Sequence, residues 1–190
     1  MSVVQQRIRE SIEVKERIFD DPEIITRIES AAEMILHSLK NGGKVLFCGN
    51  GGSATDALHL AGEFVGKFQK ERRSMPAIAL NANVASLTAV ANDYAYDFVF
   101  ARAVEGLMKP EDVLVGISTS GNSKNVFEAV CKAKEVGGKS ICLLGKNGGS
   151  IKEKADLAIV VPDSCTARIQ ESHIMIGHII CEIVENKMFE

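Results

Sequence analysis

Residues 112–123, with the sequence DVLVGISTSGNS, join a short apolar run to a turn rich in glycine and hydroxyl groups. The apolar run, 112–118, has the length and the valine and isoleucine content of a buried β-strand. Helical periodicity follows over 123–136. A strand that passes through a glycine-containing turn into a helix is the repeating unit of α/β folds with a parallel sheet.

The same succession of apolar run and helix recurs along the rest of the chain. Four further apolar runs are found at 44–49, 76–80, 139–145 and 157–161. Helices are expected at 53–68, 84–91, 97–107 and 149–154, with a long final helix over about 166–188. Near-continuous apolar strands between helices indicate a sheet covered on both faces. We therefore predict an α/β fold with a doubly wound, five-stranded parallel sheet of the flavodoxin-like type.

Two more helices are expected ahead of the first strand, over 3–19 and 22–41. Asp21 can cap the second of them, and Pro22 suits its first turn. A length of 190 residues suits one domain with a sizeable core, so we expect residues 1–190 to form a single domain.

The bulk composition narrows the class of protein. No apolar run reaches the roughly 18 residues that span a bilayer, and the N-terminal segment lacks the apolar centre of a secretory signal. The net charge of -3 leaves no basic surplus for nucleic acid. The five cysteines are odd in number and widely spaced, as is typical of free thiols in a reducing compartment. We therefore expect a cytoplasmic protein that binds neither membranes nor nucleic acid.

Two strand-to-helix loops have the composition of a phosphate-binding site. The first is GNGGS (49–53), and the second is STSGNS (118–123), which has four hydroxyl groups in six residues. Glycine lets backbone N–H groups approach an anion, and a helix N-terminus adds unpaired donors. Either loop alone would also fit an ordinary turn, since such turns need glycine and a capping serine whatever the function. Two of them in one sheet favour a phosphorylated ligand.

Two nucleotide-binding alternatives fit less well. Neither loop has the lysine of a Walker A motif. Gly49-x-Gly51-x-x-Ala54 matches the loose dinucleotide fingerprint, which expects an acidic residue near the end of the second strand. That strand ends in LNAN (80–83), without a carboxylate, which disfavours a nicotinamide or flavin cofactor.

Two helices carry candidate catalytic or metal-binding side chains. His59 and Glu63 are four residues apart and therefore share one helix face. Such a pair can hold a divalent metal or share acid–base work, although an ordinary pair on a solvated face has the same spacing. The final helix offers Gln170 and His178, which are separated by about 12 Å of helix rise. Gly177 leaves room there for another helix to approach closely.

Taken together, these motifs resemble a known family. GNGGS, His59-x-x-x-Glu63, an Asn92-Asp93 pair, GISTSGNS, and ARIQE followed by a histidine are similar to the bacterial phosphoheptose isomerases of the sugar-isomerase (SIS) domain family. The likeness extends over nearly the whole chain. GISTSGNS alone indicates the broader family, and the helix residues make the assignment more specific. One departure is Ala167, where some members have an aspartate before the Arg-Ile-Gln.

The resemblance implies roles for individual residues. Those expected to contact the substrate are Asn50, Gly51, Gly52, Ser53, Glu63, Asn92, Asp93 and Gln170, with Ser118, Thr119, Ser120 and Ser123 at its phosphate. The expected acid–base pair is Glu63 and His178. The expected ligands of one zinc ion per subunit are His59, Glu63, Gln170 and His178.

The resemblance also implies an activity and an assembly. The activity is the isomerisation of D-sedoheptulose 7-phosphate to D-glycero-D-manno-heptose 7-phosphate, the first step toward activated heptose for lipopolysaccharide or other surface glycans. The assembly is a homotetramer with active sites between subunits. Helices within 1–41 would take part in its packing, and 42–190 would form the α/β core with the C-terminal helix.

Two alternatives remain within the same family. One is a non-catalytic SIS protein that binds the replication initiator; that branch lacks the helix glutamate, so Glu63 favours an enzyme. The other is an arabinose 5-phosphate isomerase, many of which carry extra C-terminal regulatory modules that this sequence does not show after its last helix.

Overall fold

The computed structural model describes all 190 residues and confirms the predicted parallel sheet. Its strands run in the order β2-β1-β3-β4-β5. They are β1 (Val45–Gly49), β2 (Ala77–Ala79), β3 (Val113–Ser118), β4 (Lys139–Gly145) and β5 (Leu157–Val161). The chain changes direction of winding between β1 and β3, the point at which doubly wound sheets bind their ligands.

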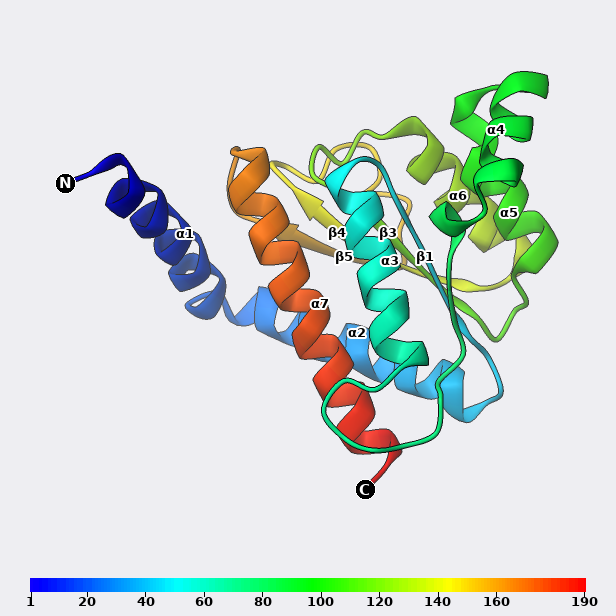
Figure 1. Ribbon diagram of the computed structural model, residues 1–190, viewed down its shortest axis with the longest axis horizontal. Helices are drawn as coiled ribbons and strands as arrows, with labels where there is room; N and C mark the ends of the chain where they lie inside the picture. The colour runs from blue at the N-terminus through cyan, green and yellow to red at the C-terminus, as the bar shows by residue number, and fades with distance from the viewer.

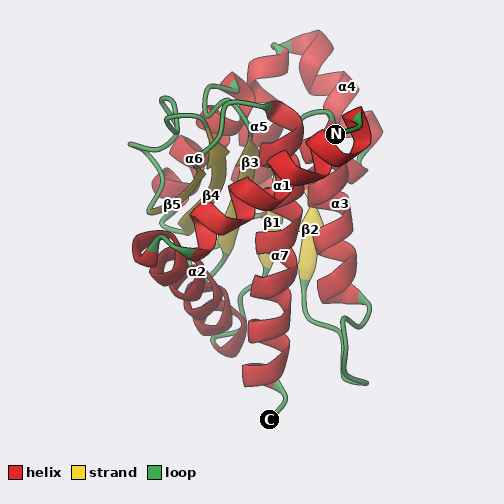
Figure 2. Ribbon diagram, turned by 90° about the vertical axis from the view of Figure 1, so that its left-hand side faces the viewer, coloured by secondary structure: helices red, strands yellow, loops and turns green.

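Helices cover both faces of the sheet, as predicted (Figure 1). One face is covered by α1 (Val3–Phe19), α2 (Pro22–Lys40), α3 (Gly52–Val65) and α7 (Thr166–Met188). The other is covered by α5 (Val99–Leu107) and α6 (Lys124–Val136), with α4 (Val84–Asp93) and the short 3-10 helices η1 (Leu80–Ala82) and η2 (Tyr96–Phe98) beside them. Figure 2 shows α1 and α7 in front of the strands.

Alternate strand residues fill two hydrophobic cores, one on each side of the sheet. In β1, Val45 and Phe47 join the core under α2, α3 and α7, whereas Leu46 and Cys48 join the core under α5 and α6. All five residues of β1 are buried, which explains its uninterrupted apolar sequence. None of the helices is both long and apolar enough to cross a membrane.

The N-terminal helices begin and end close to the predicted positions. The Asp21 side chain accepts hydrogen bonds from the backbone N–H groups of Glu23 and Ile24, and Pro22 is the first residue of α2. The last turns of α1 pack on the core, but its first half projects from the body of the molecule (Figure 1).

The helix predicted at 149–154 is wrong, because this segment forms turns. Gly148 and Gly149 have φ values of 88° and 54°, outside the right-handed helical region. The segment instead packs on the loop after β3, where the Ile151 N–H donates to the Gly121 carbonyl over 3.0 Å. This tertiary contact replaces the helix.

Two boundaries also differ from the prediction. The helix expected at 53–68 ends at Val65, and residues 66–76 form an irregular connection to β2. The helix expected at 84–91 runs on to Asp93, so Asn92 and Asp93 lie in its last turn and not in a following loop.

Candidate active site

The loop between β3 and α6 gathers hydroxyl groups at a helix N-terminus. Ser118 Oγ lies 2.8 Å from Ser123 Oγ and 3.5 Å from Ser120 Oγ, and Thr119 lies half-buried between them in sequence. Ser123 is the N-cap residue of α6, yet its hydroxyl makes no capping hydrogen bond. The Ser123 side chain is therefore directed into the loop, where a helix N-terminus favours an anion.

Contact with a second glycine turn determines the shape of this loop. Gly121 has a φ of 68°, and a Cβ added to it would lie 2.1 Å from the carbonyl oxygen of Gly148. The backbone N–H of Ser150 donates to Oδ1 of Asn122 over 3.0 Å. The turns after β4 thus support the hydroxyl-rich loop from one side, and a larger residue at position 121 would separate the two.

The loop between β1 and α3 meets the final helix. Gly51 is the N-cap of α3 with a φ of 57°, and Ser53 is buried. A Cβ added to Gly52 would lie 2.5 Å from Nε2 of Gln170. Glycine at this position therefore allows the amide of Gln170 to lie against the loop.

Asn50 is held by two residues that the sequence did not identify. Its amide exchanges hydrogen bonds of 2.8 and 2.9 Å with the amide of Asn125 in α6. The hydroxyl of Tyr96 donates to Oδ1 of Asn50 over 2.9 Å. These bonds tie the loops after β1 and β3 together, because Asn125 lies in the first turn of α6, the helix that follows the hydroxyl-rich loop.

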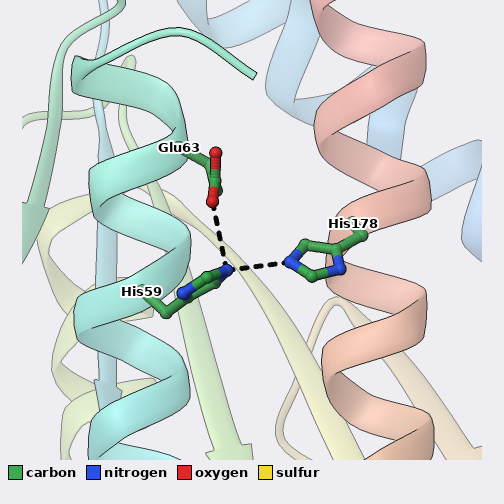
Figure 3. A group of neighbouring side chains, drawn as sticks. All are labelled: His59, Glu63 and His178. Carbon is green, nitrogen blue, oxygen red and sulfur yellow. Dashed lines mark hydrogen bonds and ion pairs between the residues drawn. The ribbon is translucent and has the colours of Figure 1, made fainter. Parts of the chain in front are cut away.

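His59, Glu63 and His178 come together between α3 and α7 (Figure 3). Nε2 of His59 lies 2.9 Å from Nε2 of His178 and 3.1 Å from Oε1 of Glu63. The close approach of the helices depends on Gly177, where a Cβ would lie 2.7 Å from Cδ2 of Leu60. The expected proximity of the two helices is confirmed.

The donor atoms of this trio fit a divalent metal. One ligand atom from each of the three residues lies within 4.8 Å of the others. Two imidazole nitrogens and one carboxylate oxygen form a common zinc ligand set, in which three protein ligands leave a position open to substrate. Gln170 lies two turns earlier on α7, with its amide against Gly52, and its part as a fourth ligand stays a prediction.

Asp56 is a further acidic group that the sequence did not single out. It lies one helical turn before His59 on α3. Its Oδ2 is buried and has no hydrogen-bond partner. Burial raises the pKa of Asp56, while the charges of His59 and His178 oppose that rise.

Asn92 and Asp93 lie apart from the other predicted site residues. Both are exposed at the end of α4, and their side chains hydrogen-bond only to each other. No residue of α4 is buried. Within one chain, this pair is not joined to the hydroxyl-rich loop or to the His59 trio.

Comparison with known proteins agrees with this arrangement. Residues 8–145 match the model of the SIS domain family. A phosphoheptose isomerase of Clostridium acetobutylicum is 50% identical over 186 residues, which cover 98% of this chain and 95% of that protein. One from Nitratiruptor is 52% identical and covers 96% of each protein.

A solved structure of a relative has the same fold as this chain. The phosphoheptose isomerase of Neisseria gonorrhoeae superposes with a TM-score of 0.91 and is 42% identical, covering 96% of this chain and 97% of that one. With the parallel sheet, the paired loops and the helix trio in place, the chain belongs to the phosphoheptose isomerases of the SIS domain family, which are sugar-phosphate isomerases.

Proposed function

We propose that the protein converts D-sedoheptulose 7-phosphate to D-glycero-D-manno-heptose 7-phosphate, the first step toward activated heptose for lipopolysaccharide or other surface glycans. The observation that carries this proposal is the meeting of His59, Glu63 and His178 between α3 and α7. Relatives about half identical to this chain over nearly its whole length are named phosphoheptose isomerases. No feature of the structure favours the initiator-binding alternative.

Phosphate recognition is assigned to the loop between β3 and α6. Ser118 offers a hydroxyl within 3.5 Å of the hydroxyls of both Ser120 and Ser123, and the N-terminus of α6 adds a favourable dipole. Thr119 belongs to the same loop. Uncharged hydroxyl donors can bind phosphate without a buried cation. The bound phosphate anchors one end of the sugar while the other end of the sugar reacts.

Proton transfer is assigned to the helix trio. Conversion of a ketose to an aldose moves hydrogen between C1 and C2 through an enediol. Glu63 takes the proton from C1 while His178 protonates the carbonyl oxygen at C2; the enediol then loses its O1 proton and gains a proton at C2. A carboxylate and an imidazole whose atoms lie within 4.8 Å of each other suit this exchange, since one can accept a proton while the other donates one.

We propose one zinc ion per subunit, held by His59, Glu63 and His178 with Gln170 as a further ligand. Bound there, zinc would stabilise negative charge on the oxygen atoms of the two reacting carbons. His59 takes no part in proton transfer in this scheme. Its contacts with Glu63 and His178 keep both side chains in place. Asn50, Gly51, Gly52 and Ser53 border the sugar.

The exposed surfaces support a homotetramer with sites between subunits. Val3, Val4 and Ile8 on the projecting half of α1 are 70%, 67% and 56% exposed. Asn92 and Asp93 can reach a sugar if they belong to the site of a neighbouring subunit. We also propose a cytoplasmic location, where a phosphorylated heptose would be produced and used.

Turnover of sedoheptulose 7-phosphate tests the proposal directly. The purified protein should form the aldose, detected by NMR, lose activity after treatment with a chelator, and regain it when zinc is added. Arabinose 5-phosphate serves as the competing substrate. No turnover of the heptulose in the presence of zinc, or faster turnover of arabinose 5-phosphate, would contradict the assignment.

A further inference from the structure

The irregular connection between α3 and β2 is fixed by a buried ion pair. Nε of Arg72 lies 2.8 Å from Oε1 of Glu185 on α7, and both side chains are only 1% exposed. A buried pair of this kind is maintained only when its remaining donors and acceptors are satisfied. Residues 66–73, called here the α3–β2 segment, supply most of the partners.

Arg72 joins the end of α3 to this pair. Its guanidinium donates to the backbone carbonyls of Glu63, Phe64 and Gly66 over 2.8, 2.9 and 2.7 Å. These carbonyls lie at the end of α3, where a helix leaves its acceptors unpaired. One planar side chain therefore ends the helix that carries Glu63 and links it to α7.

Glu185 holds the segment from the other side. Its carboxylate accepts hydrogen bonds from the backbone N–H groups of Phe68, Gln69 and Lys70 over 3.1, 2.7 and 2.9 Å. Burial by itself would raise the pKa of Glu185, but these bonds and Arg72 outweigh it and lower the pKa to about 2. The carboxylate is thus charged at neutral pH.

This path brings the ring of Phe68 onto His178. Glu185 follows His178 by seven residues, about two helical turns, so both side chains share one face of α7. The Phe68 and His178 ring centroids are 5.5 Å apart with an interplanar angle of 35°. His178 also contacts the ring of His59, with centroids 5.1 Å apart.

Few other contacts fix the imidazole of His178. A histidine that binds metal usually donates its second ring N–H to a carboxylate or carbonyl, which sets the ring orientation. His178 forms a hydrogen bond with His59 through Nε2, and Nδ1 has no hydrogen bond to the protein. The tilted contact with the Phe68 ring is therefore one of the few contacts that can fix the orientation of His178.

We propose that Arg72, Glu185 and Phe68 are positioning residues for the active site. The ion pair fixes the path of the α3–β2 segment, and Phe68 holds the His178 ring so that Nε2 faces His59 and Glu63. The inference rests on the proposed function for its effects on both zinc binding and turnover. Its effect on zinc binding can be measured without any substrate.

Phe68→Leu tests the last link while leaving the ion pair in place. Phe127→Leu is the matched control, because Phe127 is also a half-buried phenylalanine but packs on the opposite core. Zinc binding to the metal-free proteins is measured by competition with a chromophoric chelator. We expect Phe68→Leu to weaken zinc about tenfold and to lower kcat more than it raises KM, and the control to match the wild type.

Arg72→Lys tests the first link. A lysine keeps the charge beside Glu185 but cannot bond to that carboxylate and three carbonyls together, so we expect zinc affinity to fall in the same direction. Equal zinc affinity of Phe68→Leu and Phe127→Leu would overturn the inference, as would failure of the wild type to bind zinc. Zinc binding without turnover of the heptulose would instead contradict the proposed substrate. If Arg72→Lys does not fold, the zinc affinities of Phe68→Leu and Phe127→Leu still test the inference.

Discussion

Glu63 contributes the only carboxylate to the group it forms with His59 and His178. Glu63→Gln keeps the size of the side chain but removes its ability to accept a proton. We expect kcat to fall at least about 100-fold, the usual contribution of a general base, while substrate still binds through its phosphate. Steady-state kinetics and calorimetric binding of the substrate measure the two effects separately.

The control for that variant is Glu71→Gln, which removes a surface carboxylate 86% exposed and paired only with Lys67. Turnover of Glu63→Gln close to that of Glu71→Gln would show that Glu63 is not the base. His178→Gln, compared in the same way, tests the partner acid.

His173 illustrates a buried histidine that serves the fold. It is fully buried, its Nε2 is 2.9 Å from the Leu144 carbonyl oxygen, and its Nδ1 has no partner. Burial lowers its pKa from 6.5 to about 4, which the bond to Leu144 only partly offsets. Its stabilising contribution is complete above pH 6.5 and is lost as the pH falls toward 4, because the unfolded chain takes up the proton first.

We therefore expect His173 to lower the free energy of unfolding by about 2 kcal/mol when the pH falls from 7 to 5. Urea denaturation at these two values measures the loss, and Glu185, which titrates at lower pH, does not interfere. In His173→Gln the amide can still donate to the Leu144 carbonyl. Because glutamine does not titrate, the loss of unfolding free energy between pH 7 and pH 5 should be smaller in this variant. An identical pH dependence in the variant would rule out His173 as its source.

Contacts between site residues could be predicted where both residues lie on one helix, because their spacing in the sequence places them side by side. His59 and Glu63 are such a pair, and the structure places them 3.1 Å apart. Asn125, Tyr96 and Phe68 were missed because their site contacts join different segments of the chain. The bond between Tyr96 and Asn50 spans 46 residues, and no local pattern encodes it.

At the scale of elements, short apolar runs between helices made the five strands predictable, whereas tertiary contacts determined the errors. The predicted extension of α3 to residue 68 failed because Arg72 binds the carbonyls at Glu63, Phe64 and Gly66. The predicted helix at 149–154 failed because its glycines meet the loop at Gly121. Both competing interactions come from residues outside the segments concerned.

The N-terminus of α6 offers a test in which binding and stability separate. Because the Ser123 hydroxyl faces Ser118 and does not cap the helix, Ser123→Ala should raise KM about tenfold through the loss of a bond to phosphate. The melting temperature should stay close to that of the wild type. Enzyme kinetics and thermal denaturation provide the two measurements.

Asp21→Ala should change stability and not substrate binding, because the Asp21 side chain caps α2. This change should lower the free energy of unfolding by about 1 kcal/mol and leave KM unaltered. A Ser123→Ala protein with normal KM and reduced stability would show that the hydroxyl serves the fold and not the phosphate.

For the whole molecule, the exposed apolar side chains of α1 predict how subunits associate. Ile8→Glu puts a charge where the proposed tetramer buries apolar surface, so the variant should dissociate and lose activity with its shared sites. Analytical ultracentrifugation measures the assembly. Glu16→Gln, at another exposed position of α1, should stay tetrameric. A wild-type protein that is monomeric at micromolar concentration would contradict the proposal.

The order of strands could be predicted as a whole because parallel strands joined by helices allow few arrangements. The flavodoxin-like order 2-1-3-4-5 is confirmed. The position of α4, with no buried residue, was not predictable, because helical periodicity does not say which element its apolar face will pack against.

The joining of α3 to α7 also has a consequence for how the protein is made. His178 follows His59 by 119 residues, which a ribosome adding roughly 5–20 residues per second makes about 6–24 s later. Until α7 emerges, the buried Arg72 has no Glu185, and the α3 face that will meet α7 is uncovered. A nascent chain therefore assembles its trio only after α7 has been made, and a product terminated before α7 lacks both His178 and the ion pair.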